Sequence, residues 1–335
     1  MTERVKRIYC EENNLAVGIY EEPIFNDRIR LFGHSIAFYN YRAMINRLGE
    51  NEYFKMYKDI KNRVIEYIQN TSTFQEMQKV TKDAYDVKLA VEKLPRSDIY
   101  KDCNIGDDFI SIDMIKGNFN SYVTLSRIID EADKFNNGSY NYNNFISQFT
   151  DEGYLINSRD FRQQIFGKCA PSETSIFERY ITRRFLAKLL DMEYINISDI
   201  VTVHDDEIVL RVTDTVKKNL EVIKAEVRAS ESPLSYQMYS IWKITDTYAY
   251  IKHIFDGKDE GKDIVKNARK REQPSIYRFL ANEKGDCSDL MYIDEMSGKK
   301  AMLLEKYALG IEKEKQYDKK YFIDKSSRKK AKFVE

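Results

Sequence analysis

The stretch DIVTVHDDEIVLRV, residues 199–212, decides the fold of this 335-residue chain. It contains two short runs of β-branched and aliphatic residues, DIVTV and EIVLRV, on either side of His204, Asp205 and Asp206. Short runs of this kind around a polar turn are typical of a β-hairpin. The sequence therefore predicts two antiparallel strands with a pair of acids at their turn.

A further strand is predicted earlier in the chain, in the stretch FISIDMIK of residues 109–116. Every second residue of its first part is aliphatic, which is a strand period, and from about Asn120 the apolar spacing becomes helical. Asp113 therefore lies near the carboxyl end of a strand that leads into a helix. If this strand joins the hairpin in one sheet, Asp113 comes to the same sheet edge as Asp205 and Asp206.

Carboxylates gathered at one edge repel each other unless cations lie between them. Two Mg²⁺ ions about 4 Å apart would satisfy them, and such a pair can activate a 3′-hydroxyl and stabilise a pyrophosphate leaving group. The candidate catalytic residues are Asp113, Asp205 and Asp206, and Glu207 joins them as a candidate ligand of Mg²⁺ or Mn²⁺. Because Asp is a common turn former, an ordinary turn without metal is the alternative.

A basic helix is predicted between the two acidic segments, over residues 158–168 (SRDFRQQIFGK). Arg159, Arg162 and Phe166 follow each other at spacings of three and four, so they fall on one helix face. Two guanidinium groups there could hold a triphosphate while the aromatic ring stacks on a base. Lys168 is a further nucleotide-binding candidate. The alternative is a solvated basic face with Phe166 in the core.

Three local patterns together resemble the palm and fingers motifs of family A DNA polymerases and of their single-subunit RNA polymerase relatives. The turn V-H-D-D (203–206) resembles the family's V-H-D-E catalytic turn. Residues 158–167 resemble the fingers pattern R-R-x-x-K-x-x-N-F-G, with Arg159 at the second Arg and Arg162 in place of the Lys that binds the triphosphate. Asp113 has the place of the first metal-binding Asp, and the order of the three patterns is the family's order.

The resemblance covers about residues 108–215, a third of the chain, and includes departures from the family pattern. The Tyr-Gly that follows the fingers pattern in the family is absent, because Ala170 and Pro171 stand near that place. Asn118 occupies the position of the family's Glu that helps exclude a 2′-hydroxyl. The choice of sugar is therefore open.

The fold that the resemblance implies is α+β, with a polymerase-type palm on a small antiparallel sheet. The mainly helical residues 1–104 would be thumb-like. Residues 105–215 would form the palm core, with a helical fingers insertion at 120–197. Residues 216–335 would form a C-terminal α/β extension that ends in a basic tail.

The function expected on this basis is that of a compact template-directed nucleic-acid polymerase, similar to DNA polymerases, which transfers nucleotides to a 3′-hydroxyl by a two-metal mechanism. Its partners would be a primer-template, nucleoside triphosphates and a further protein. The first alternative is a catalytically silent palm-fold protein that binds nucleic acid or assembles a replication complex. The second is a metal-dependent nuclease that uses the same acids.

Composition limits how such a protein could hold nucleic acid. The chain carries 54 Lys and Arg against 54 Asp and Glu, so local basic patches must supply the phosphate contacts. Residues 158–188 hold seven Lys and Arg against three acids, a net charge of +4, and residues 319–335 form a second basic segment. The sequence has no long uncharged apolar run, so we expect a soluble, cytoplasmic protein without a membrane partner.

Other elements are predicted from periodicity and capping. A small hairpin is expected within residues 1–30. The remaining predictions are helices at 36–48, 53–69, 73–94, 172–190 and 216–229, and β-structure at about 235–255. The helix at 73–94 is expected to begin with a capping box of Thr73 and Glu76 and to end before Pro95.

Overall fold

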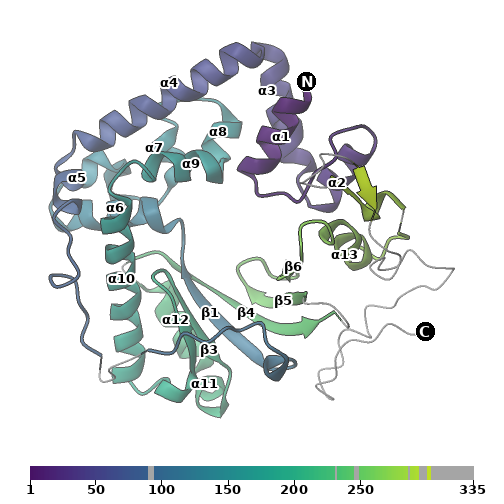
Figure 1. The fold of residues 1–335 in the computed structure, drawn as a ribbon. Helices are drawn as coiled ribbons and strands as arrows, with labels where there is room; N and C mark the ends of the chain where they lie inside the picture. Colours follow the sequence, from purple (N-terminus) through teal and green to yellow (C-terminus); the bar gives the residue numbers. More distant parts are fainter. Residues whose placement is uncertain (90–93, 231, 245–248, 286, 294–299, 303–335) are drawn as a thin grey trace.

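The chain folds into one antiparallel sheet with helices on one face and a helical arch beyond one end, as the computed structural model shows (Figure 1). The structure describes residues 1–89, 94–230, 232–244, 249–285, 287–293 and 300–302. The sheet has six strands in the order β2-β3-β1-β4-β5-β6, and a second sheet pairs β7 with β8. The combination of helices with antiparallel sheets confirms the predicted α+β class.

Strand β1 (Asp108–Met114) lies inside the sheet and pairs on one side with the hairpin of β2 (Ile200–Val203) and β3 (Glu207–Arg211). All these pairings are antiparallel, so the strand and hairpin expected from the sequence are confirmed. The register places Asp113 opposite Glu207, and the backbone N–H of Met114 donates to the carbonyl of Asp206 at 3.0 Å. The acidic turn therefore lies beside the carboxyl end of β1.

On its other side, β1 pairs along its whole length with β4 (Leu234–Lys243). Strands β5 (Tyr250–Gly257) and β6 (Asp263–Lys266) continue the sheet. Strands β4, β5 and β6 therefore lie in the same sheet as β1, although they follow residue 216 in the chain.

The two faces of the sheet differ in their cover. Ile110, Ile112 and Met114 of β1 belong to the main core, which also contains buried residues of α6 (Gly117–Ile128), α10 (Pro171–Asp191) and α12 (Leu220–Arg228). The alternate residues of β1 (Phe109, Ser111 and Asp113) lie on the opposite face, since successive strand residues point to opposite sides. We call it the Asp113 face.

Part of the Asp113 face is covered by the segment 95–105. This segment runs along the outer edge of β2, where the N–H of Val203 donates to the carbonyl of Pro95 at 3.1 Å. Ile99 and Ile105 then pack in a buried cluster with Phe109 and its neighbours on β3, β4 and β5. The face is therefore apolar and closed around Phe109 and becomes polar toward Asp113.

The N-terminal helices form the arch at the top of Figure 1: α1 (Glu3–Glu12), α2 (Ile24–Leu31), α3 (Ser35–Leu48), α4 (Glu50–Gln69) and α5 (Ser72–Met77). The helices predicted at 36–48 and 53–69 are confirmed. The hairpin predicted within residues 1–30 is wrong, because α1 and α2 occupy that segment.

The helix predicted at 73–94 is mostly wrong, because α5 ends at Met77. Its cap is Thr71, whose hydroxyl accepts from the N–H of Phe74 at 3.1 Å, and not the expected box of Thr73 and Glu76. The carboxylate of Glu131 also accepts from the N–H groups of Ser72 and Thr73. A partner far away in the sequence thus fixes the start of this helix, and residues 90–93 lie outside the described residues.

Three short helices lie between α6 and α10, below α4 in Figure 1: α7 (Tyr142–Ile146), α8 (Gly153–Asn157) and α9 (Arg159–Phe166). Helix α9 confirms the predicted basic helix, and its cap is Ser158, whose hydroxyl accepts from the N–H of Phe161 at 3.1 Å. Helix α10 begins at Pro171, since proline is tolerated in the first turn, so the helix predicted at 172–190 is confirmed with its start one residue earlier.

The remaining elements complete the chain. The predicted helix at 216–229 is divided into α11 (Asp214–Lys218) and α12. The C-terminal elements are α13 (Gln273–Leu280), β7 (Met291–Ile293) and β8 (Lys300–Met302). Short 3₁₀ helices are found at Asp102–Asn104, Ala132–Lys134, Asn136–Gly138, Ile197–Asp199 and Cys287–Leu290. The basic tail predicted at 319–335 lies outside the described residues.

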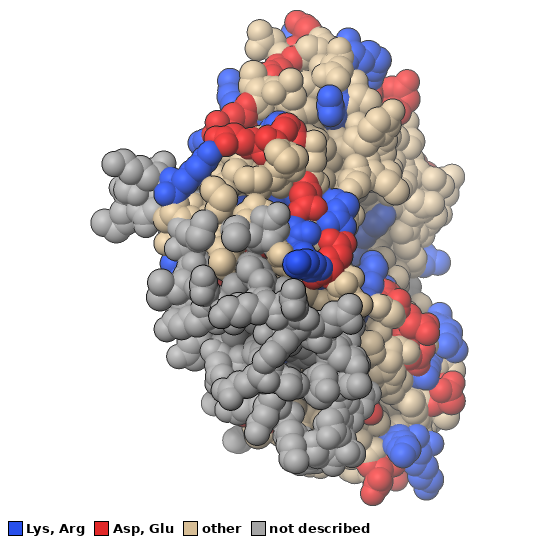
Figure 2. Space-filling view, turned by 90° about the vertical axis from the view of Figure 1, so that its right-hand side faces the viewer, with Lys and Arg blue, Asp and Glu red and all other residues tan. Residues whose placement is uncertain are grey.

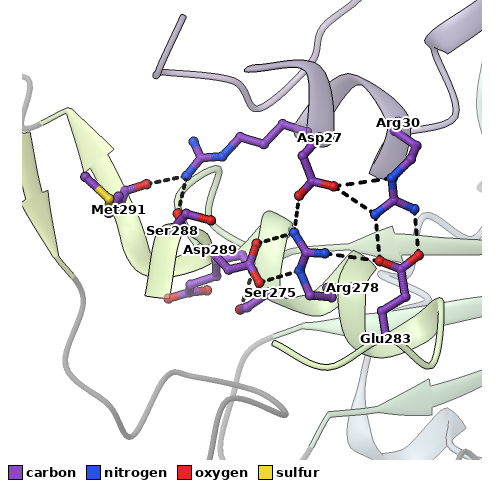
Figure 3. A network of polar contacts seen from close by, with 10 residues as sticks. Asp27, Arg30, Ser275, Arg278, Glu283, Ser288, Asp289 and Met291 are labelled. Carbon is purple, nitrogen blue, oxygen red and sulfur yellow. Dashed lines mark hydrogen bonds and ion pairs between the residues drawn. The ribbon is translucent and has the colours of Figure 1, made fainter. Parts of the chain in front are cut away.

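A buried ion network joins the N-terminal helix α2 to the C-terminal helix α13 (Figure 3). Arg278 donates to both carboxylate oxygens of Asp289, at 2.5 and 2.9 Å, and also bonds Asp27 and Glu283. Arg30 of α2 completes the ring with two bonds of 2.6 Å to Glu283. The side chains of Arg278 and Asp289 are only 8% and 1% exposed, so the network is shielded from solvent at its centre.

The surface on the side of α2 and α13 shows acidic and basic residues interspersed among uncharged ones (Figure 2). This distribution agrees with the equal numbers of each charge in the sequence. Among the helices of the described ranges, none combines the length and the apolar character that crossing a membrane requires.

We expect Arg278→Met to lower the free energy of unfolding by about 3–5 kcal/mol, because it leaves the buried Asp289 carboxylate without its main counter-charge. Urea unfolding measures this loss. The control Lys79→Met removes an exposed ion pair with Glu76 and should cost about 1 kcal/mol or less. Equal losses for the two variants would contradict a stabilising role for the network.

Candidate functional site

Three of the predicted acids meet at the carboxyl end of β1. Asp113 and Glu207 are cross-strand neighbours, and such neighbours lie on the same face of a sheet. Burial and the nearby Asp206 raise the pKa of Asp113 to about 6. Burial, with a contribution from Glu207 and Asp205, also raises the pKa of Asp206. The negative charges of this group are therefore poorly compensated.

Glu207 is held in place by a short hydrogen bond, in which the hydroxyl of Ser111 donates to Oε1 at 2.5 Å. Ser111 lies two residues before Asp113 on the same face of β1. Glu207 contributes to the raised pKa values of both Asp113 and Asp206. This carboxylate is thus fixed beside the other two.

A further acid, Glu178 of α10, was not among the residues singled out from the sequence. Its Oε1 would lie 2.8 Å from a Cβ atom placed on Gly117, so the glycine at the start of α6 makes room for it. Burial, followed by Asp206, Asp205 and Asp113, raises the pKa of Glu178 to about 8. In the sequence Glu178 is one of three acids in the segment of α10, and no local pattern connects it to Asp113.

Asp205 differs from the other acids because it has a counter-charge. Arg179 Nε lies 2.8 Å from its Oδ1, and this contact lowers the pKa of Asp205. Arg96 and Arg183 lower it further. The two acids of the predicted turn therefore have different surroundings: Asp206 faces other carboxylates, and Asp205 faces basic groups.

The donor chemistry of the cluster suits a hard divalent cation, since carboxylate oxygens are the ligands that Mg²⁺ prefers. Asp206 raises the pKa of Asp113, and Asp206 and Asp113 both raise the pKa of Glu178, as expected for neighbouring acids. Within the described residues, however, no three or more Asp, Glu, His or Cys side chains are arranged to hold a metal ion as they stand. The residues fit Mg²⁺ in type and charge, and binding would require side chains to rotate.

A cationic group lies at the turn between β1 and α6, next to the acids. Lys116 has φ +48° and ψ +49°, a left-handed conformation that is uncommon for lysine. Its Nζ lies 5.4 Å from the centre of the Tyr142 ring, and Arg162 Cζ lies 5.6 Å from the same centre. Burial and Arg162 lower the pKa of Lys116, and the nearby Lys258 lowers it further.

Amide side chains hold these two cations in place. Lys116 Nζ donates to Asn143 Oδ1 at 3.1 Å, and Arg162 Nε donates to Asn118 Oδ1 at 3.3 Å. Neither cation is within ion-pair distance of a carboxylate in the part of the chain that the structure describes. Two neighbouring cations without a counter-ion favour the binding of an anion.

Of the other nucleotide-binding candidates, only Phe166 differs from its expected role. Arg159 is exposed and close enough to Arg162 to lower its pKa, in agreement with a shared helix face. Phe166 is 2% exposed and packs against Phe119 and Tyr122 with ring centres 6.0 and 5.5 Å away. It therefore belongs to the core and, as placed, cannot stack on a base. Lys168 is exposed beyond the end of α9.

Comparison with known proteins adds no relative. No protein-family model, no curated protein and no solved structure matches this chain.

The raised pKa of Glu178 predicts a pH-dependent stability. Between pH about 4.5 and about 8, the folded chain keeps a proton on Glu178 that the unfolded chain has released, so the free energy of unfolding falls as pH rises. Glu178→Gln should remove up to about 4 kcal/mol of this fall, at about 1.4 kcal/mol for each pKa unit, measured by urea unfolding at pH 5 and pH 8.5.

The control Asp191→Asn changes an exposed acid at the end of the same helix and should leave the pH dependence as it is. If Glu178→Gln unfolds with the same pH dependence as the unchanged protein, Glu178 does not carry the charge repulsion assigned to it.

Proposed function

We propose that this chain is a template-directed nucleic-acid polymerase that transfers nucleotides to a 3′-hydroxyl, with DNA as the substrate that the sequence resemblance favours. The observation that carries the proposal is the juxtaposition at one strand end of two opposite groups. Asp113 and Asp206 supply carboxylates whose charge is only partly compensated, and Lys116 and Arg162 supply cations that form no ion pair with a described residue. Nucleotidyl transfer needs both groups together.

The carboxylates would hold the divalent ion. Asp113 and Asp206 are the proposed ligands, Glu178 is within electrostatic reach, and Glu207 is fixed beside them by Ser111. When bound, Mg²⁺ would lower the pKa of the attacking hydroxyl and neutralise charge on the departing phosphates. Asp205 could join this set only by leaving Arg179.

The cations would hold the triphosphate. Arg162 offers a planar fork of donors to phosphate oxygens, and Lys116 adds a point charge from the turn that follows Asp113. In the reaction, the 3′-oxygen bonds to the α-phosphorus and its proton passes to solvent. The bond between the α-phosphorus and the bridging oxygen breaks, and pyrophosphate leaves with the electron pair. The net +4 of residues 158–188 would provide phosphate contacts to the nucleic acid.

Two observations favour another candidate function, that of a catalytically silent protein of the same fold that binds nucleic acid. Asp205 is paired with Arg179, and the described side chains form no ready three-ligand metal site. Such a protein would bind triphosphate and nucleic acid without any dependence on divalent ions. A requirement for Mg²⁺ or Mn²⁺ separates the two candidates.

The proposal predicts primer extension with Mg²⁺ or Mn²⁺, assayed with both deoxy- and ribonucleoside triphosphates. Asp113→Asn should abolish incorporation while leaving the urea unfolding midpoint at pH 7 unchanged or slightly higher, because it relieves repulsion within the acidic group. Asp133→Asn, an exposed acid away from the group, is the matched control and should keep full activity. Incorporation by Asp113→Asn at the unchanged rate would refute the site, and shortening of the primer would instead indicate a nuclease.

The triphosphate assignment predicts that Arg162→Ala raises the apparent nucleotide KM about tenfold and also lowers kcat, since a charge-assisted hydrogen bond contributes about 1.5–3 kcal/mol. Arg162→Lys should retain partial activity, because it keeps a point charge without the planar fork. Arg184→Ala removes an exposed arginine of α10 and serves as the control. Kinetics of Arg162→Ala equal to those of the control would exclude Arg162 from the triphosphate site.

A further inference from the structure

A cavity of about 420 Å³ opens on the Asp113 face, bounded by β2 to β6 and by the segment 95–105. Its volume is within the range of small-ligand sites, about 300–1,000 Å³. Glu207, which is paired with Asp113, forms one part of its wall, so the cavity adjoins the acidic group. Charged and aromatic side chains line it, among them Arg96, Tyr100, Tyr239, Lys252 and Lys266.

The cavity has an excess of positive charge that the described part of the chain does not neutralise by ion pairs. Arg96, Lys252 and Lys266 line it against two acids, Asp98 and Glu207. No carboxylate among the described residues lies within ion-pair distance of these three cations. An anionic ligand would therefore gain three favourable contacts.

Lys252 is the most constrained of the three cations. It is 7% exposed, its Nζ donates to Gln237 Oε1 at 2.7 Å, and it lies 4.1 Å from the centre of the Tyr239 ring. Burial lowers the pKa of Lys252 to about 8, and Glu207 and Asp113 oppose this change. Lys252 therefore lies between the acidic group and the interior of the cavity.

The far end of the cavity is closed. Ile99 packs in the buried cluster over Phe109, and the Tyr100 ring lies 6.1 Å from the Tyr250 ring. From Asp113 to Phe109 the strand advances four residues, about 13 Å. The buried cluster around Phe109 therefore limits how far a ligand can extend along this face, which favours a short ligand such as one nucleotide unit.

We propose that this cavity binds one unpaired nucleotide unit. Lys252 and Lys266 would contact its phosphate, Tyr100 would contact its base, and its sugar would lie toward Glu207 and Asp113. This site goes beyond the proposed function, because the binding needs neither metal nor catalysis. Lys116 and Arg162, where the triphosphate is proposed to bind, do not line this cavity.

The test is a calorimetric titration of the full chain with adenosine 5′-monophosphate in EDTA. Lys252→Met and Lys266→Met should each weaken binding about tenfold or more. Lys262→Met, which removes an exposed lysine of the β5–β6 turn, and Arg162→Ala should leave it unchanged. Lys266 is on the edge strand β6, so Lys266→Met still tests the site if Lys252→Met fails to fold. Lys252→Arg keeps the positive charge and should bind the monophosphate as the unchanged protein does.

Competition experiments distinguish the binding of a single nucleotide from the binding of a duplex. A short single-stranded oligonucleotide should displace the monophosphate, and a blunt duplex should not. Absence of monophosphate binding, equal affinity in both lysine variants, loss of binding in Arg162→Ala, or displacement by the blunt duplex would each overturn the proposal. Monophosphate binding together with absent primer extension would refute the polymerase function and leave the cavity assignment in place.

Discussion

The pairing of β1 between β3 and β4 is the constraint on which the rest of the site depends. Its register places Asp113 opposite Glu207 and beside the backbone of Asp206. The helices on the other face then add Glu178, which reaches the same point because Gly117 has no side chain. The fold thereby concentrates carboxylates that it does not neutralise, and a cation is the simplest way to relieve their repulsion.

The chain also holds two separate groups of cations, and ion pairs with the described residues do not neutralise either group. Lys116 and Arg162 lie over Tyr142 at the turn after β1, and Lys252 and Lys266 line the cavity across the sheet. A reaction that joins two phosphate-bearing substrates at a divalent ion would use this arrangement. The charge is local in both groups, which agrees with a chain whose total charge is zero.

The sheet and the acidic turn could be predicted because their signals are local, namely alternation in β1 and a polar turn between two β-branched runs. The end of α5 at Met77 could not, because Glu131 holds the start of that helix through contacts distant in sequence. Phe166 follows the arginines at helical spacing, yet burial against Tyr122 decides its role. Only tertiary contacts bring Glu178 to the acidic group and Lys252 to the cavity, so no sequence pattern identifies them.

The most direct test of the proposed polymerase site is the anomalous scattering of Mn²⁺ in crystals grown with a non-hydrolysable nucleoside triphosphate. We expect a manganese peak bonded to Asp113 and Asp206, with the phosphates on Arg162 and Lys116. A triphosphate bound elsewhere, or manganese absent from these two carboxylates while the nucleotide occupies Arg162, would contradict it.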